Sequence, residues 1–242
     1  MNYIVVIPAR YKSSRLPGKP LIKLKGTPMI IRTYRQCLKA VSSNKIYVAT
    51  DSNLIKKTCE REGIQVVMTP SSCLTGTDRV AEVAKKIKTK YYINVQGDEP
   101  LFNPKDLKKL LKFTKRKTND VLLGYCKLTN LKQFFNKNVP KLVFDKNKYL
   151  IYSSRSPIPN ENKVNMSKNF KGVWAYLFPR EKLLRFGHEK KKTFLEQIED
   201  IEILRWIELG IKVKLIKMSE HSHPVDTMSD IKKVVKKIKN NN

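Results

Sequence analysis

The chain has 242 residues, of which 40% are apolar, and this suits one large domain or one domain with a small annex. No apolar run approaches the roughly 18 residues of a transmembrane helix, and the N-terminal sequence has no signal-peptide pattern. The four cysteines are scattered without a CxxC pair, which argues against a disulfide framework and a zinc site. We therefore expect a cytoplasmic protein with no stable membrane association.

The formal charge of +29 leaves two interpretations. A nucleic-acid-binding protein would gather its lysines into one stripe with interleaved aromatic side chains. In this chain the lysines are spread over nearly every predicted helix, as on an ordinary solvated surface. We therefore expect no nucleic-acid partner, while the excess positive charge would attract small anions.

Short, β-branched apolar runs alternate with segments of helical spacing in the first half of the chain. The predicted strands are 3–9, 45–50, 64–69, 91–96 and 120–128, and the predicted helices are 28–41, 52–63, 77–88 and 103–116. Ser52 is the expected N-cap and Gly63 the expected C-cap of the second helix. This order predicts an α/β fold with a mostly parallel, Rossmann-like twisted sheet and helices on both faces.

The pattern changes between residues 129 and 178. A β-hairpin is expected over 140–154, with its turn at Asp145–Lys148, followed by a strand over 170–178. An amphipathic helix over 193–210, a strand over 211–218 and a basic helix over 229–242 complete the chain. We expect 1–128 and 179–242 to form the α/β domain, and 129–178 to form a β-rich annex.

A basic loop follows the first strand, at the edge of the sheet where ligands bind in open α/β folds. Its basic side chains are Arg10, Lys12, Arg15 and Lys19, and accessible backbone N–H groups are expected at Ser13, Ser14 and Gly18. Guanidinium groups, ammonium groups and amides together suit a triphosphate, although the loop is neither a Walker loop nor GxGxxG. A flexible surface loop is the alternative, which the stiffening prolines at 8, 17 and 20 disfavour.

Two aspartates are candidate metal ligands at the same edge. Asp98 follows the predicted strand 91–96 beside Gly97, and Asp226 lies in the late stretch PVDT. Mg²⁺ is commonly held by one or two carboxylates together with phosphate oxygens. Each aspartate alone could be a helix cap, but a pair opposite a basic loop favours a magnesium site.

Two shorter stretches have less specific patterns. TGTDR (75–79) opens a helix, where Gly76 permits close backbone approach and Thr77 is the expected cap. Arg79 would face an anionic substrate or lie on the surface. His221 and His223 lack a third ligand of their type nearby, so we expect a loop pair or a site lining rather than a metal centre.

Several long motifs of this chain resemble those of the CMP-Kdo synthetases, the 3-deoxy-manno-octulosonate cytidylyltransferases. They occur in the order of that family: IPARYKSSRLPGKPL, VATD, TGTDRVAEV, NVQGDEP, YSSRSPIP and VDT. The resemblance implies the nucleotide-diphospho-sugar transferase type of fold, in which the α/β domain binds the nucleotide. It also implies that the annex serves for homodimerisation and contributes to the sugar site.

The implied reaction joins CTP to a 3-deoxy-2-keto sugar acid with Mg²⁺, releasing pyrophosphate, for lipopolysaccharide or capsule synthesis. The residues matched to catalysis are Arg10, Arg15, Lys19, Asp98 and Asp226, the two aspartates being the metal ligands. Those matched to the nucleotide are Pro8, Ala9, Arg10, Ser13, Arg15, Lys19, Thr75, Gly76, Thr77 and Gln96. Those matched to the sugar are Arg79, Gln96, Tyr152, Arg155 and Glu196.

The chain departs from the family pattern in two places where the sugar is expected. Phe170 and Trp174 stand in a stretch that usually reads His-x-Gly-x-Tyr, and Ile203 replaces the glutamine of Leu-Glu-Gln-Leu-Arg. Kdo, an amino derivative or another ulosonic acid therefore all stay open, as does a same-fold enzyme for a neutral sugar or a cofactor precursor. Glu196 and Glu199 would face the sugar or lie on the solvent side of their helix.

Overall fold

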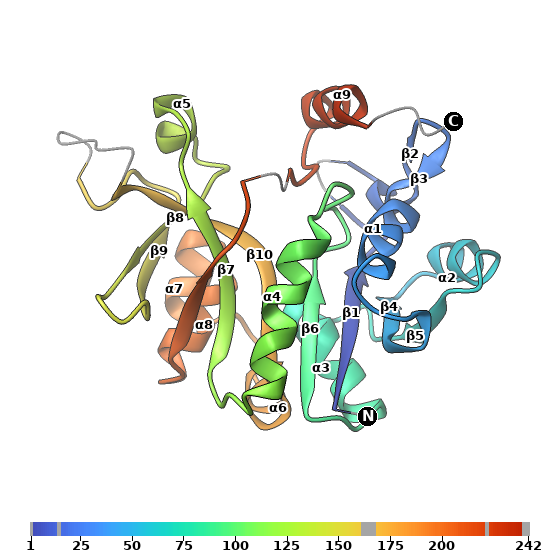
Figure 1. Cartoon of the computed structure of the whole chain (residues 1–242), viewed down its shortest axis with the longest axis horizontal. Helices are drawn as coiled ribbons and strands as arrows, with labels where there is room; N and C mark the ends of the chain where they lie inside the picture. The colour runs from blue at the N-terminus through green and yellow to red at the C-terminus, as the bar shows by residue number, and fades with distance from the viewer. Residues whose placement is uncertain (1, 14–15, 161–167, 221–222, 239–242) are drawn as a thin grey trace.

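One twisted sheet forms the centre of the protein, whose computed structural model describes residues 2–13, 16–160, 168–220 and 223–238 (Figure 1). Its main strands are β1 (Tyr3–Ala9), β4 (Ile46–Thr50), β5 (Gln65–Met68), β6 (Tyr91–Val95), β7 (Val121–Lys127), β10 (Phe170–Pro179) and β11 (Val213–Lys217). They are ordered β11-β7-β10-β6-β1-β4-β5. Only β10 runs antiparallel to its neighbours in this order, so the predicted mostly parallel sheet is confirmed.

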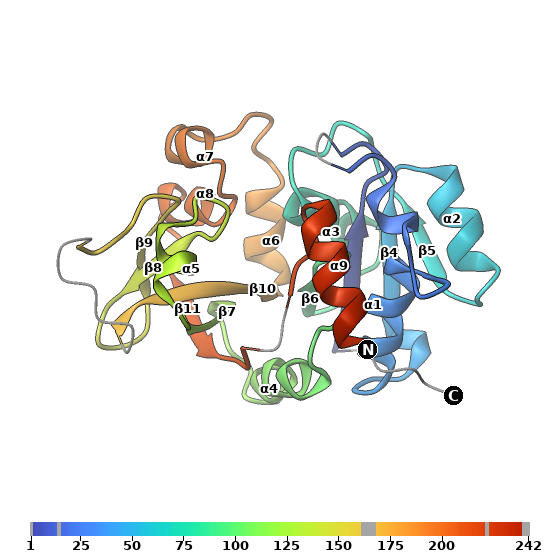
Figure 2. The ribbon, with the colours of Figure 1, turned by 90° about the horizontal axis from the view of Figure 1, so that it is seen from above.

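Helices cover both faces of the sheet, as predicted (Figures 1 and 2). Side chains of α1 (Met29–Leu38), α2 (Asn53–Glu60) and α4 (Pro104–Lys115) share one apolar core with the sheet. Those of α3 (Gly76–Lys86), α6 (Arg180–Phe186) and α8 (Ile203–Glu208) build the core on the other face. In the described parts of the chain, every helix is too short or too polar to cross a bilayer.

Smaller elements complete the rim above the sheet. In Figure 1 the helices α5 (Leu131–Phe135) and α9 (Met228–Lys237) lie above the sheet, whereas α7 (Phe194–Glu199) lies lower, beside α8. The crossover between β1 and β4 contains, besides α1, four short elements: η1 (Lys19–Leu21), β2 (Lys23–Leu24), β3 (Thr27–Pro28) and η2 (Ser43–Lys45). Val234 of α9 packs with Leu24 and Met29, which fixes α9 beside the start of α1.

Helix caps explain where several of these helices begin. The Ser52 hydroxyl accepts a hydrogen bond from Ile55 N at 3.5 Å, so the predicted cap of α2 is confirmed. At the start of α3 the expected cap was wrong, because Thr75 and Asp78 form a capping box instead. Thr77 lies inside the first turn, and its backbone N–H donates to Glu202 Oε2 at 3.2 Å.

The prediction of a single helix over 193–210 is wrong. The structure has two short helices, α7 and α8, separated at Asp200, whose backbone is left-handed with φ 51° and ψ 47°. This break inserts Ile201 into the core and lets the acidic first turn of α7 approach Arg205 of α8. The burial of Ile201 and the ion pair between Glu196 and Arg205 thus stabilise the broken helix more than the lost helical hydrogen bonds destabilise it.

The β-hairpin predicted over 140–154 is confirmed, because β8 (Lys141–Phe144) and β9 (Leu150–Ser154) pair antiparallel. Asp145 closes its turn, because its carbonyl accepts from Lys148 N at 3.0 Å and its side chain from Tyr149 N at 2.8 Å. The first residues of β10 pair with β8, and the same strand then continues between β6 and β7. The expected boundary at 178 therefore falls within a strand that both parts share, and the division into two domains stays a prediction.

Gly124 provides a test of packing where β7, β10 and the end of β11 meet. A Cβ atom at this position would lie 2.6 Å from Val173 O and closer still to Met218 Sδ. We expect Gly124→Ala to lower the free energy of unfolding by about 1–3 kcal/mol, because the backbone neighbour cannot move away freely.

Urea denaturation of the variant beside Lys57→Ala, an exposed change on α2, checks this expectation. The control should stay within about 0.5 kcal/mol of the unchanged chain. Equal midpoints for the two variants would contradict the tight packing at Gly124.

Candidate active site

A cavity of about 340 Å³ opens beyond the carboxyl ends of β1 and β6. From β1 the chain crosses first to β4 on one side and later to β6 on the other, so these ends flank the topological switch point of the sheet. Ligands of open α/β sheets bind at such points. The cavity is walled by the loop after β1, the start of α3, the loop after β6 and the α7–α8 segment.

Lys19 and two aspartates meet in the wall of this cavity. Lys19 Nζ lies 2.5 Å from Asp98 Oδ2 and 3.2 Å from Asp226 Oδ1. Burial by itself would lower the pKa of Lys19, but the two carboxylates outweigh it and raise the pKa above 10.5. The lysine is therefore charged throughout the physiological pH range.

Backbone contacts bring the three charged residues together from distant parts of the chain. The carbonyl of Asp98 accepts a hydrogen bond from Val225 N at 3.0 Å, which places Asp226 beside Asp98. Gly97 allows its loop to approach the end of β1, because a Cβ atom there would lie 2.7 Å from Pro8 O. The convergence of the basic loop with both aspartates agrees with the arrangement expected from the sequence.

Most of the predicted site residues line this one cavity. On the nucleotide side they are Pro8, Ala9, Arg10, Ser13, Lys19, Thr75, Gly76 and Gln96. The others are Arg79, Asp98, Glu196 and Asp226. Arg15 and His221 lie outside the described residues, so nothing is added to their expected roles.

Two of the lining residues are fixed by ion pairs with the protein. Arg79 is 2% exposed; its guanidinium contacts Thr69 Oγ1 and lies 3.0 Å from Asp51 Oδ2, so a surface arginine is excluded. Glu196 is fully buried and paired with Arg205, so the solvent-side alternative for this residue is wrong.

Tyr152 and Arg155 are placed against α7 rather than in the lining of this cavity. Both contact Glu199, through the Tyr152 hydroxyl at 3.4 Å and Arg155 N at 2.9 Å. Arg155 also donates to the carbonyl of Asp200 at 2.9 Å, and Asp200 does line the cavity. Their described contacts support the end of α7, and a contact with a sugar stays a prediction.

The departures from the family pattern have different surroundings. Ile203 is fully buried in the apolar core below the cavity, and Phe170 packs in an aromatic cluster with Tyr125 and Phe144. Trp174 lines a second cavity of about 560 Å³, which shares Asp226 with the first. His223 contacts Lys237 in that second cavity.

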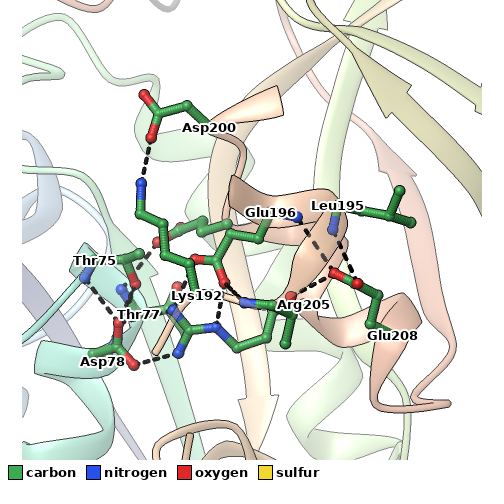
Figure 3. A network of polar contacts seen from close by, with 11 residues as sticks. Thr75, Thr77, Asp78, Lys192, Leu195, Glu196, Asp200, Arg205 and Glu208 are labelled. Atoms are coloured by element: carbon green, nitrogen blue, oxygen red, sulfur yellow. Dashed lines mark hydrogen bonds and ion pairs between the residues drawn. The ribbon is translucent and has the colours of Figure 1, made fainter. Parts of the chain in front are cut away.

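Sequence reasoning missed three charged residues of the lining: Lys192, Asp200 and Glu202. They lie in and around α7 and α8, and Lys192 contacts Asp200 there (Figure 3). Burial raises the pKa of Glu202 above 4.5, against the lowering effect of the Thr77 N–H that its carboxylate accepts. Asp200 and Glu202 were missed because the sequence predicts a continuous helix over 193–210 without a turn at Asp200. Lys192 lies before that helix in a run of three lysines, which carries no motif.

Asp98 and Asp226 have the chemistry of a divalent-cation site. Their oxygens converge on one ammonium group, and hard carboxylate oxygens are the ligands that Mg²⁺ prefers. No cluster of three or more His, Cys, Asp and Glu side chains is found within 2–13, 16–160, 168–220 and 223–238. The two carboxylates therefore suit an ion whose other ligands are phosphate oxygens and water.

The fold and the site define a nucleotidyltransferase. At the switch point of a doubly wound sheet, a basic loop lies opposite two converging acids, and the N-terminus of α3 lines the same cavity. The chain belongs to the cytidylyltransferase family, whose model matches residues 4–216.

Similar proteins carry a more specific name. A 3-deoxy-manno-octulosonate cytidylyltransferase from Geotalea daltonii is 37% identical over 252 aligned residues, which cover 99% of each chain. The protein of that name from Escherichia coli is 32% identical, over 96% of this chain and 94% of its own. A solved structure of CMP:2-keto-3-deoxy-manno-octonic acid synthetase complexed with CTP has a TM-score of 0.88 at 32% identity, covering 98% of both chains.

Glu202 gives the site a pH-dependent contribution to stability. Because its pKa is raised in the folded chain, the folded state binds more protons than the unfolded state at pH values above 4.5. This contribution is present at low pH and is lost as the pH rises from 4.5 through the raised pKa. Glu202→Gln removes it, so the unfolding free energy of the unchanged chain should fall relative to that of the variant over this window.

Urea unfolding of both proteins at several pH values between 4 and 8 checks this sign. Glu60→Gln, at an exposed glutamate on α2, serves as the matched control. If the Glu202→Gln curve ran parallel to that of the unchanged chain, Glu202 would not be the titrating group.

Proposed function

We propose that this protein transfers the cytidylyl group of CTP to 3-deoxy-manno-octulosonate, giving CMP-Kdo and pyrophosphate. The convergence of Lys19, Asp98 and Asp226 at the switch point carries the proposal, because it supplies charge of both signs for a metal-bound triphosphate. The full-length similarity to enzymes named for this reaction supports the choice of CTP and of the sugar acid.

The residues of the basic loop would bind the triphosphate. Arg10 and Lys19 project from this loop toward the cavity, and guanidinium and ammonium groups form charge-assisted hydrogen bonds with phosphate oxygens. Thr75 and Gly76 line the cavity at the N-terminus of α3 and would hold the nucleotide beside Gln96. Gly76 matters here, because a Cβ atom would lie 3.0 Å from Gln96 Oε1.

Asp98 and Asp226 would hold Mg²⁺. When bound, such an ion neutralises the charge that spreads over the phosphate oxygens during transfer. Asp98 also fixes the position of its loop through its carbonyl, so the same residue serves the fold and the site.

The sugar would lie between the triphosphate and the α7–α8 wall. Its anomeric hydroxyl attacks the α-phosphate in line, one P–O bond forms, and the bond to the bridging oxygen of pyrophosphate breaks. Glu202 belongs to this wall, where its carboxylate accepts a hydrogen bond from Thr77 N and lies beside the Tyr176 hydroxyl, so it would fix the wall against which the sugar lies. The protein does little covalent work and acts by positioning and charge neutralisation.

The proposal includes further features of the enzyme. We expect a cytoplasmic homodimer that uses the β-rich annex and supplies lipopolysaccharide or capsule synthesis. The buried position of Ile203, away from the lining, favours Kdo itself or a close relative, because the departure there does not remove a polar group from the cavity surface.

The reaction is tested by pyrophosphate release with CTP, UTP, GTP or ATP, each with Mg²⁺. The acceptor panel contains Kdo, an amino derivative, another ulosonic acid and a neutral hexose. We expect turnover with CTP and Kdo and a CMP-sugar of the correct mass, with far slower reaction of the neutral sugar. Turnover with the neutral sugar alone, or with no acceptor, would overturn the proposed function.

Asp98→Asn tests the metal site. Loss of one carboxylate charge should lower kcat by about 100-fold or more, while the folded structure is kept because the backbone bond of Asp98 to Val225 remains. Steady-state kinetics over a range of Mg²⁺ concentrations, with circular dichroism as the check on folding, measures this. The exposed Glu60→Gln is the control, and wild-type kinetics of Asp98→Asn would remove Asp98 from the site.

A further inference from the structure

Arg205 joins two buried acids behind the cavity (Figure 3). Its side chain is fully buried, and its Nε and Nη2 atoms each lie 2.7 Å from a carboxylate oxygen of Glu196. On its other edge, Nη1 lies 2.6 Å from Asp78 Oδ1 and Nη2 lies 3.2 Å from Asp78 Oδ2. A planar guanidinium can bind two carboxylates at once with two N–H contacts to each, whereas an ammonium group binds them as a point charge without this bidentate geometry.

Each acid fixes one wall of the cavity. Asp78 accepts hydrogen bonds from the backbone N and the hydroxyl of Thr75, both at 2.8 Å, and this capping box sets the start of α3. Glu196 accepts from Thr193 N at 3.2 Å in the capping box of α7. Thr75 and Glu196 both line the cavity, so one arginine sets the distance between two walls that are far apart in sequence.

The surroundings of Arg205 make this link rigid. The Phe186 ring lies against the guanidinium, with 4.0 Å between the guanidinium carbon and the ring centroid. Glu208 holds the same turn of α7 through Leu195 N at 3.0 Å and Glu196 N at 3.3 Å. Removal of Arg205 alone would leave two buried carboxylates close to each other without a counter-charge, which is strongly unfavourable.

Two parts of the cavity lining matter here: the Thr75 wall, formed by Thr75 and Gly76 at the start of α3, and the α7–α8 wall, formed by Glu196, Asp200 and Glu202. We propose that Arg205 is a positioning residue, which holds these two walls at the separation at which nucleotide and sugar acid are aligned for transfer. It touches neither reactant, because the walls lie between it and the cavity. The inference rests on the proposed function, in which the Thr75 wall binds the nucleotide and the α7–α8 wall binds the sugar.

The variants separate positioning from stability. Arg205→Met removes the link and leaves Asp78 and Glu196 unpaired, so it should lower both stability and activity. Arg205→Met combined with Asp78→Asn and Glu196→Gln removes all three charges and keeps the shapes, so much of the stability should return. We expect kcat/KM for the sugar in the triple variant to stay about 100-fold below that of the unchanged enzyme, the size expected for a misplacement of about 1 Å. It should also stay well below that of Glu196→Gln alone, which measures the loss of any direct contact between Glu196 and the sugar.

A stability control is available at a buried acid that does not line the cavity. Asp106 is buried on α4 and accepts hydrogen bonds from Ser219 N at 3.0 Å and Lys109 Nζ at 2.8 Å. Asp106→Asn should therefore lower the melting temperature without changing kcat or KM. All variants are assayed at a temperature at which circular dichroism shows each of them folded.

Kinetics and CTP binding by calorimetry together decide the inference. A fall in kcat and a rise in KM for the sugar in the stable triple variant, with unchanged kinetics in Asp106→Asn, would support positioning. Wild-type kcat/KM in the triple variant, or an equal kinetic loss in Asp106→Asn or in Glu196→Gln alone, would overturn it. If the unchanged enzyme makes no CMP-Kdo, the proposed function fails, and CTP binding then decides the inference by itself. CTP binding that is about 10-fold weaker in the triple variant than in the unchanged protein would support it, and equal binding would overturn it.

Discussion

The site depends on one ammonium group held between two carboxylates. Lys19 is separated from Asp98 by 79 positions and from Asp226 by 207, so three distant loops have to meet for this contact to form. Two carboxylates placed together repel each other, and the lysine offsets this repulsion in the absence of other cations. The three groups still carry a net charge of −1, which leaves the point attractive to a further cation beside an anionic substrate.

The strands and the helices of the first half follow the sequence closely, because their signals are local. Ser52 and Gly63 mark the ends of α2 by side-chain capping and backbone conformation, and both are visible in the sequence. The site residues of the loops after β1 and β6 were also predictable, since parallel strands deliver them to one edge. The place of β10 was not, because pairing between distant strands leaves no trace in either segment alone.

The misplaced features share a physical cause, which is a buried charge. The turn at Asp200 and the capping box at Thr75 both belong to segments that contact Arg205 or Asp78. Local propensity favours one helix over 193–210, but a helix without a break would not bring Glu196 and Arg205 into the same buried pair. Glu202 was missed for the same reason, because its side chain lines the cavity only when the helix is broken at Asp200.

The strand β10 is hydrogen bonded to the hairpin strand β8 at its first residues, and to β6 and β7 in the central sheet. One continuous strand therefore belongs both to the annex and to the central sheet. Its pairing with β7 is irregular between Val173 and Tyr176, and strands bend at such irregularities. A displacement of the hairpin would therefore pass along β10 to the strands β6 and β7 on either side of it. The hairpin and the edge of the sheet that carries the cavity are therefore joined through one strand, although the sequence suggested two separate domains.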